Sequence, residues 1–293
     1  MILDKFQHLA EAQKPADYLG QFQGKEPGPT ITILGGLHGN ETVGIDSVQS
    51  LIRYALMGIK NGTLNLGIGN PEACKIGERY VEEDANRLFG VGSNSVDGKR
   101  VQQLEPYLAQ SDLLIDLHST LKDSEPLLII PEMHHKLSAV VGRLATPTVV
   151  TGAGLWPPNG KPIESDLYCA SHGGLGITYE AGGPNCADPH LVTENIVRAL
   201  QHLGVFDPKL QGTSYIRDIY TIPKIIKATD YIVAGHEFEF VKDWQNWEKV
   251  KAGEVIAKQA GSTIAAAQDS IILFPKPNAR IVPGQQACYL LAA

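Results

Sequence analysis

The sequence lacks the features that define several classes of protein. Its four cysteines lie far apart and form no CxxC pair, so neither a zinc knuckle nor a disulfide framework is indicated. Its longest apolar runs, such as LLII at 127–130, fall far short of the ~20 residues that a membrane-spanning helix needs. The net charge is −7 and no block of Lys and Arg is present, so we expect no nucleic-acid partner.

The first residues also lack the pattern of a signal peptide. Acidic residues appear from Asp4 onward, and no basic region is followed by an apolar core and a cleavage site. We interpret residues 1–18 as a short amphipathic helix. We expect a cytoplasmic protein that has no membrane partner.

The chain does have the length and the apolar content for a large buried core. Its 293 residues, 43% of them hydrophobic, suffice for one large domain and a smaller one. Short runs rich in β-branched residues or leucine predict strands that are buried on both faces. These runs occupy residues 30–34, 63–69, 112–117, 126–131, 147–151 and 175–180.

Helical patterns alternate with these runs. After His38, apolar residues spaced by three and four predict a helix with one buried face. Two more helices are predicted over 98–110 and 134–144, and a fourth has Asp188 as its N-cap. This alternation predicts an α/β domain with a largely parallel sheet, which we place at residues 1–205.

Beyond that domain the pattern changes to short alternating strands separated by turn residues. They are predicted at 213–222, 242–250, 254–259, 262–266 and 270–275. We therefore expect residues 206–293 to form a small β-rich, barrel-like domain that shapes access to a site on the α/β domain. Parts of it resemble the small barrels of biotinyl and lipoyl carriers. Because the segment between those parts has no MKM-like tip, a carrier role is not favoured.

The stretch GGLHGNE at 35–41 places a histidine and a glutamate three residues apart where a strand gives way to a helix. That spacing brings His38 and Glu41 to one side, and the glycines let the backbone pass close to an ion. A catalytic zinc site uses three protein ligands and leaves one position open. His118, at the carboxyl end of the run 112–117, is the candidate third ligand, with Asp116 nearby. The alternative is that both histidines merely fill or cap strand ends.

Four motifs, in this order, resemble those of the succinylglutamate desuccinylase and aspartoacylase family, whose fold is related to zinc carboxypeptidases. They are HGNE at 38–41, ERYVEEDANRLF at 78–89, DLHST at 116–120 and YEAGG at 179–183. The resemblance implies a mostly parallel sheet flanked by helices. It also implies one zinc ion per chain, held by His38, Glu41 and His118.

The resemblance further assigns roles in catalysis and substrate binding. It implies that Glu180 acts as the general base and that Arg79 polarises the scissile carbonyl and stabilises the oxyanion. It also implies that Asn86 and Arg87 hold a substrate carboxylate. Considered without the motif, Glu180 is better interpreted as a helix-capping or salt-bridged acid. The arginines are equally consistent with surface ion pairs to neighbouring acids such as Asp84.

Two features depart from the family pattern. The family takes a further arginine from the segment before the catalytic glutamate, but residues 144–180 contain none, and Lys161 is the only Lys or Arg there. The family also uses a tyrosine from its C-terminal domain, and no tyrosine here lies in a motif that we can match. His172 lies in the loop that leads into the strand of Glu180, so we expect it to border the pocket and contact substrate.

These observations together predict a zinc-dependent amidohydrolase. Its expected substrate is a small N-acyl amino acid or a related amide that carries a carboxylate. A zinc carboxypeptidase acting on short peptides or peptidoglycan fragments is one alternative, and a catalytically silent ligand-binding protein of the same fold is another. Mixed nitrogen and oxygen ligands would also accept cobalt, manganese or iron. The sequence leaves the oligomeric state open, with a homo-oligomer among the alternatives.

Overall fold

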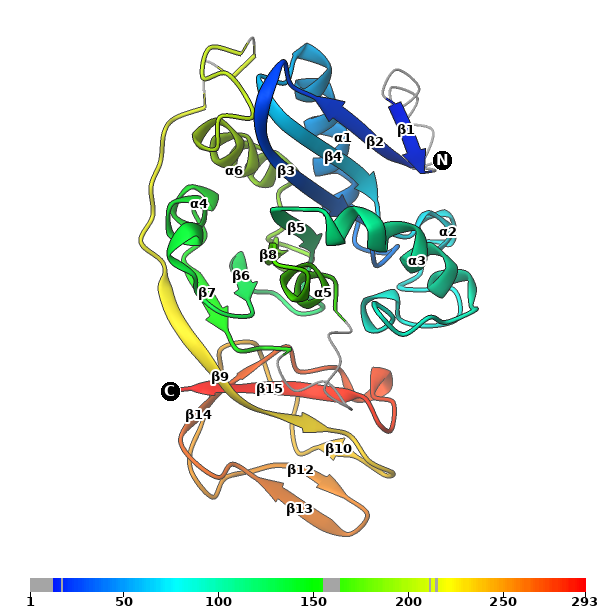
Figure 1. Ribbon diagram of the computed structural model, residues 1–293. Helices are drawn as coiled ribbons and strands as arrows, with labels where there is room; N and C mark the ends of the chain where they lie inside the picture. The colour runs from blue at the N-terminus through cyan, green and yellow to red at the C-terminus, as the bar shows by residue number, and fades with distance from the viewer. Residues whose placement is uncertain (1–12, 17, 155–163, 211, 214–215) are drawn as a thin grey trace.

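The computed structural model describes residues 13–16, 18–154, 164–210, 212–213 and 216–293 (Figure 1). The fold is a mixed α/β structure built on one large sheet. In sheet order its strands are β1 (Gln13–Ala16), β2 (Leu19–Gln23), β4 (Asn61–Ile68), β3 (Glu26–Gly35), β5 (Leu113–His118), β8 (Leu175–Glu180), β6 (Leu127–Ile130), β7 (Thr148–Thr151), β9 (Lys224–Val233), β15 (Gln286–Ala292), β14 (Ser270–Leu273) and β11 (Lys249–Val250).

The centre of this sheet is mostly parallel, as the continuous apolar runs predicted. The pairs β4–β3, β3–β5, β5–β8, β6–β7 and β7–β9 are parallel, whereas β6–β8 is antiparallel. All six strands predicted between residues 30 and 180 are present, as β3 to β8. β5 is buried along its whole length because helices cover both faces of the sheet.

Six α-helices accompany the sheet in the described part of the chain. They are α1 (Thr42–Met57), α2 (Pro71–Ile76), α3 (Val96–Ala109), α4 (Ser138–Leu144), α5 (Ser165–Ser171) and α6 (Pro189–His202), with short 3-10 turns η2 (Ala85–Arg87), η3 (His135–Leu137) and η5 (Asn278–Arg280). α1, α4 and α6 pack on one face of the sheet, and α3 and α5 pack on the other (Figure 1). Asp188 caps α6 as predicted, since its side chain accepts a hydrogen bond from the His190 N–H.

Three predictions of secondary structure were wrong. The described part of the N-terminal segment, Gln13–Ala16, is an edge strand rather than a helix, and residues 1–12 and 17 lie outside the described residues. Pro15 fits this result, because proline disfavours helix at the preceding residue and is tolerated in an edge strand.

The other two errors lie near the start of the C-terminal region. The described residues of 213–222 form no strand, and the strand begins instead after Pro223, as β9. Most of 242–250 is turn, and only Lys249–Val250 pair as β11. In both segments apolar and polar residues alternate. The apolar side chains Ile219, Tyr220 and Ile222 of the first segment are exposed, whereas the second segment buries apolar side chains in a loop. Trp244, for example, is fully buried in a turn.

The C-terminal region is antiparallel and rich in strands. A second sheet contains β10 (Glu239–Phe240), β12 (Val255–Gln259) and β13 (Ser262–Ala265). The large sheet continues past residue 205, because β9 pairs with β7 on one edge and with β15 on the other. An apolar cluster that includes Leu127, Leu273 and Tyr289 joins the two parts of the chain. The boundary at residue 205 stays a prediction.

In the part of the chain that the structure describes, no helix has both the length and the apolar character needed to cross a membrane.

Candidate functional site

The turn between β3 and α1 brings His38 and Glu41 together. Gly36 has a φ of +69°, a conformation that side-chain-bearing residues rarely adopt. A Cβ atom on Gly39 would lie 2.1 Å from the backbone carbon of Ala73, so only glycine fits there. The glycines of the motif therefore let the turn pack tightly against α2, while the side chains of His38 and Glu41 come into contact with each other.

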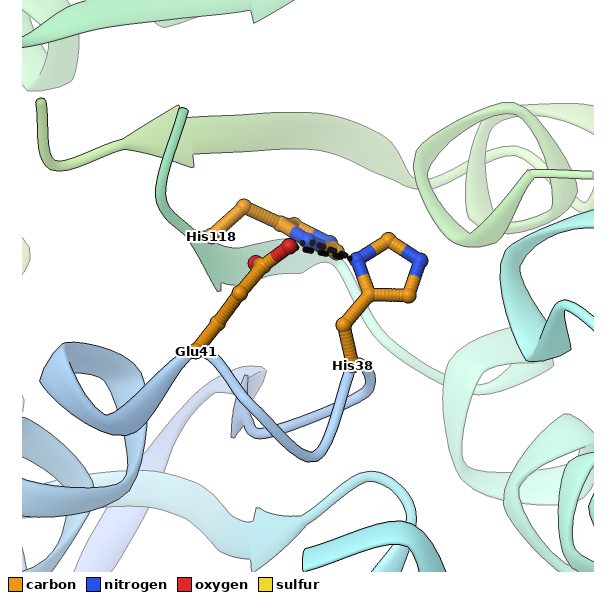
Figure 2. A group of neighbouring side chains, drawn as sticks. All are labelled: His38, Glu41 and His118. Atoms are coloured by element: carbon orange, nitrogen blue, oxygen red, sulfur yellow. Dashed lines mark hydrogen bonds and ion pairs between the residues drawn. The ribbon is translucent and has the colours of Figure 1, made fainter. Parts of the chain in front are cut away.

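His118, the last residue of β5, completes a cluster of three side chains (Figure 2). His38 Nδ1 lies 2.9 Å from Glu41 Oε1, and His118 Nδ1 lies 3.0 Å from Glu41 Oε2. The two Nδ1 atoms are 3.1 Å apart, and all three residues are buried. Their candidate ligand atoms lie within 4.8 Å of one another, which is a separation that one metal ion can bridge.

Each histidine also contacts an aspartate carboxylate through its Nε2 atom. His38 Nε2 is 3.0 Å from Asp84 Oδ1. His118 Nε2 is 3.1 Å from Asp116 Oδ2, in an ion-pair contact whose alignment is too poor for a hydrogen bond. Such carboxylates orient metal-binding histidines and raise their basicity. The sequence indicated a place for Asp116 near the site, but it suggested Asp84 only as an arginine partner.

The charges in the cluster favour a bound cation. Burial alone would raise the pKa of Glu41, but the attraction of His38 and His118 outweighs burial and lowers it. Burial likewise opposes ionisation of Asp84, and nearby Arg79 and His38 hold its pKa well below the ordinary value. Burial would lower the pKa of His118, yet Asp116 and Glu41 raise it. The cluster therefore stabilises positive charge between its carboxylates.

Glu180 ends β8 directly beside His118, because the two residues are register partners on neighbouring strands. Burial is the main cause that raises the pKa of Glu180 to about 7, and the charge of Glu41 adds to it. Glu180 Oε2 is buried and lacks a hydrogen-bond partner, as do His118 Nε2 and Asp116 Oδ1. No other buried side-chain nitrogen or oxygen in the described residues is unpartnered. Such a concentration of unsatisfied polar atoms indicates a site for a ligand or an ion.

Arg79 reaches the cluster from the loop after α2. Its Nη1 donates to Glu41 Oε1 at 3.3 Å, and its Nε and Nη2 donate to Asp84 Oδ2 at 3.2 and 3.1 Å. The ion pair with Asp84, which the sequence suggested as an alternative to a catalytic position, therefore exists. It also holds the guanidinium at the cluster, while 34% of the Arg79 side chain stays exposed to solvent.

The buried carboxylate of Asp97 anchors this loop. It accepts hydrogen bonds from the backbone N–H groups of Val81, Glu82 and Glu83, at 3.0, 2.7 and 3.0 Å. Asn70 Nδ2 donates to it as well, at 2.6 Å. Asp97 belongs to α3, so this helix fixes the loop that carries both Arg79 and Asp84.

Asn86 and Arg87 lie in η2, next to the start of α5. Asn86 Oδ1 accepts a hydrogen bond from the Ser165 N–H at 2.9 Å. Arg87 Nη1 donates to the Asn86 carbonyl at 2.6 Å and pairs with Glu164 Oε1 at 2.9 Å. Burial would lower the pKa of Arg87, but Glu164 and Asp84 raise it further above its ordinary value. Arg87 therefore keeps its full charge at the edge of the site.

One cavity of about 540 Å³ joins these side chains. It is lined by His38, Glu41, Arg79, Asp84, Asn86, Arg87, His118 and Glu180, together with C-terminal residues that include Asn246, Phe274, Lys276, Arg280 and Tyr289. No motif in the sequence would place a tyrosine of the C-terminal region here, and the sequence did not indicate Lys276. No local pattern points to either residue, because only the return of β14 and β15 to the large sheet brings them here.

His172 does not join this group, so the geometry of this cavity gives no support to the prediction that it contacts substrate. It caps the end of α5, is exposed, and does not line the cavity. Its ring instead packs against Tyr168, with centroids 4.4 Å apart. The loop of His172 leads into the beginning of β8, whereas Glu180 is at its end. Six strand residues separate the two edges of the sheet by roughly 17 Å.

Comparison with known proteins places the chain in a family. Residues 27–203 match the family described as succinylglutamate desuccinylase/aspartoacylase catalytic domain. The succinylglutamate desuccinylase of Shewanella amazonensis is 26% identical over 292 residues, which cover 89% of this chain and 81% of that protein.

Solved structures share the fold. The structure of succinylglutamate desuccinylase from Vibrio parahaemolyticus superposes with a TM-score of 0.75 at 19% identity, covering 94% of this chain and 86% of that one. The enzyme of the same name from Chromobacterium violaceum gives 0.67 at 20% identity, covering 99% and 98%.

Proposed function

The chain belongs to the succinylglutamate desuccinylase/aspartoacylase family, and from that premise we propose that it is a zinc-dependent amidohydrolase. Both activities in the family name are hydrolytic deacylations. The proposed substrate is a small N-acyl amino acid or a related amide that carries a carboxylate. The observation that carries the proposal is the buried cluster of His38, Glu41 and His118 with the unpartnered carboxylate of Glu180 beside it.

The three side chains fit a zinc ion. Two imidazole nitrogens and a carboxylate oxygen are a donor set of catalytic zinc sites, and Asp84 and Asp116 provide the outer carboxylates that such histidines usually contact. Zinc bound there would polarise the scissile carbonyl and increase the acidity of water.

The chain's own residues would perform the proton transfers. Glu180 has a free, buried oxygen and a pKa raised to about 7, so it can accept a proton from the attacking water and return it to the departing amine. Arg79 would donate a hydrogen bond to the carbonyl oxygen as negative charge develops on that atom. Its existing contacts with Glu41 and Asp84 hold it at this edge of the cavity before substrate arrives.

Asn86 and Arg87 would hold the carboxylate of the substrate. The contacts of Arg87 with the Asn86 carbonyl and with Glu164 both use Nη1. A guanidinium has five N–H donors, and the other donors of Arg87 have no hydrogen-bond partner among the described residues, so they could make a bidentate contact with a carboxylate. We further propose that residues 206–293 narrow the access to the cavity, since Asn246, Phe274 and Tyr289 line it. This narrowing would favour small amides over peptides.

The test is the release of free amine from a panel of N-acetyl, N-succinyl and N-formyl amino acids by zinc-loaded protein. A parallel set of dipeptides and tripeptides tests the carboxypeptidase alternative. Turnover of the acyl amino acids, abolished in the Glu180→Gln variant, would support the proposal and identify the acyl group. Turnover of the peptides alone would favour the peptidase. Bound zinc with no turnover of either set would favour a silent binding protein.

A further inference from the structure

Ser165 is a buried residue that has no role in the proposed chemistry. It is the first residue of α5, and none of its surface is exposed to solvent. Its hydroxyl donates to Asp116 Oδ2 at 2.5 Å. Its backbone N–H donates to Asn86 Oδ1 at 2.9 Å. Ser165 therefore contacts both the carboxylate next to a proposed metal ligand and a side chain proposed to bind substrate.

Asp116 depends on the Ser165 hydroxyl for its hydrogen bonding. The carboxylate is fully buried, and its Oδ1 has no hydrogen-bond partner. Its Oδ2 lies 3.1 Å from His118 Nε2, but these two groups are too poorly aligned for a hydrogen bond. Among the described residues, the Ser165 hydroxyl is thus the only hydrogen-bond donor to this carboxylate. A buried carboxylate without a donor is unfavourable, so loss of the hydroxyl should leave Asp116 free to change its orientation.

The orientation of Asp116 in turn affects His118. A carboxylate that contacts a metal-binding histidine fixes the orientation of the ring. Ser165 Oγ and His118 Nε2 approach the same oxygen atom of Asp116. The serine therefore helps to set the position of the oxygen that the imidazole contacts. Because Ser165 belongs to α5 and His118 to β5, the helix contributes through Asp116 to the geometry at the end of the strand.

Asn86 holds Ser165 from the other side. The hydrogen bond from the Ser165 N–H to Asn86 Oδ1 is buried and joins residues 79 positions apart in the sequence. The contacts form a continuous chain from Asn86 through Ser165 and Asp116 to His118. One end of this chain is proposed to bind the substrate carboxylate, and the other is proposed to bind the metal. A chain of buried polar contacts can transmit a displacement at one end to the other.

We propose that Ser165 is a positioning residue that holds Asp116, and through it His118, in the orientation needed to bind zinc. Asn86 then supports the metal site through Ser165, in addition to its proposed contact with the substrate. This inference rests on the proposed function, because it takes His118 to be a zinc ligand.

The experiment measures the affinity for zinc by competition with a chromogenic chelator, so it requires no substrate. The proteins are the wild type, Ser165→Ala, Asn86→Ala, the double variant and Ser111→Ala. Neither alanine variant at positions 86 and 165 changes the charge of the site. Ser111 is the matched control, since it is also a buried serine with a hydrogen-bonded hydroxyl. It precedes β5, whereas His118 ends that strand.

We expect Ser165→Ala to bind zinc about tenfold more weakly, at the lower end of the effect of altering the groups that support metal ligands. Asn86→Ala should bind zinc about 3- to 10-fold more weakly. In the double variant the two losses should not add, because both act through the same chain of contacts. Ser111→Ala should match the wild type. Unchanged affinity in either single variant, or full addition of the two losses, would overturn the inference.

A cobalt spectrum separates positioning of the ligands from a general loss of stability. Mixed nitrogen and oxygen ligands also accept cobalt, and the visible absorption of bound cobalt depends on the geometry of its ligands. The spectrum should change in Ser165→Ala and stay as in the wild type in Ser111→Ala. Thermal melts of the metal-free proteins compare their stabilities. A lower melting temperature of Ser165→Ala with the wild-type spectrum and zinc affinity would mean a structural role alone and would refute the inference.

Turnover assays distinguish failure of this inference from failure of the proposed function. If the wild type binds zinc but releases no amine from any substrate, the proposed deacylation fails, and the zinc affinities still test Ser165. If the wild type is active and the variants bind zinc as it does, only the inference about Ser165 fails. A wild type that binds no zinc would refute both.

Discussion

His118 and Glu180 are register partners at the carboxyl ends of two neighbouring parallel strands, β5 and β8. The sheet itself therefore places the proposed general base next to a proposed metal ligand. Neither side chain depends on a loop for its position. Because the backbones of β5 and β8 are hydrogen-bonded to each other, the separation of ligand and base is set by the rigid centre of the fold.

The first prediction concerns Glu180. Replacing it with glutamine keeps the size of the side chain but removes its ability to accept a proton. We expect kcat to fall by about 10²- to 10⁴-fold, the usual contribution of a general base. Zinc content, measured by elemental mass spectrometry, should stay at the wild-type level. A variant that keeps more than a tenth of the activity would refute the assignment of Glu180 as the base.

Asp84 and Asp116, which contact the two histidines, should control the affinity for zinc. Asp84→Asn and Asp116→Asn each remove a charge that orients a histidine, so zinc should bind about 10- to 100-fold more weakly. Competition with a chromogenic chelator measures this affinity. Asp269→Asn is the matched control, since Asp269 is exposed and pairs with Lys251 far from the cluster in sequence. Unchanged affinity in both variants would show that the carboxylates do not support the metal ligands.

Arg87 should be needed as an arginine and not only as a positive charge. Lysine offers a point charge without the planar fork that binds a carboxylate through two hydrogen bonds. In Arg87→Lys we expect KM to rise about tenfold, by the loss of one charge-assisted hydrogen bond. Steady-state kinetics on the best substrate measure this, with the exposed Arg53→Lys of α1 as control. A wild-type KM in Arg87→Lys would exclude Arg87 from the carboxylate site.

Asp97 should contribute to stability as well as to the position of the loop. Asp97→Asn weakens four hydrogen bonds to a buried carboxylate, and we expect the free energy of unfolding to drop by roughly 2–3 kcal/mol at pH 7. These hydrogen bonds lower the pKa of Asp97 in the folded state. Its contribution is therefore complete above the ordinary pKa of about 4 and is lost as the pH falls through the lowered value.

Urea denaturation of the wild type and Asp97→Asn at pH 7 and at low pH measures this contribution. The difference between the two proteins should shrink in acid. Glu254→Gln, at an exposed position in the C-terminal region, serves as control. A difference that stays constant with pH would mean that the charge of Asp97 does not stabilise the loop.

The sequence by itself determined the parallel centre of the sheet and the candidate metal ligands. Continuous apolar runs predict buried strands, and parallel strands present their carboxyl ends at a common edge. His118 and Glu180 each end such a strand, and the glycine-rich turn of His38 and Glu41 follows another. The positions of these residues at one edge of the sheet followed from local periodicity and the direction of the strands, whereas the role of Glu180 came from the resemblance to the family.

Only the tertiary structure decided what surrounds those residues. Asp84 reaches His38 across 46 residues of sequence, and Lys276 enters the cavity because β9, β14 and β15 extend the large sheet. The position of His172 was likewise decided by the tertiary structure. A loop that is close to a strand in sequence can join either end of that strand, and the loop of His172 joins the end of β8 opposite Glu180. Apolar periodicity reports which face of an element is buried. Apolar periodicity does not predict which polar side chain from a distant part of the sequence contacts that element.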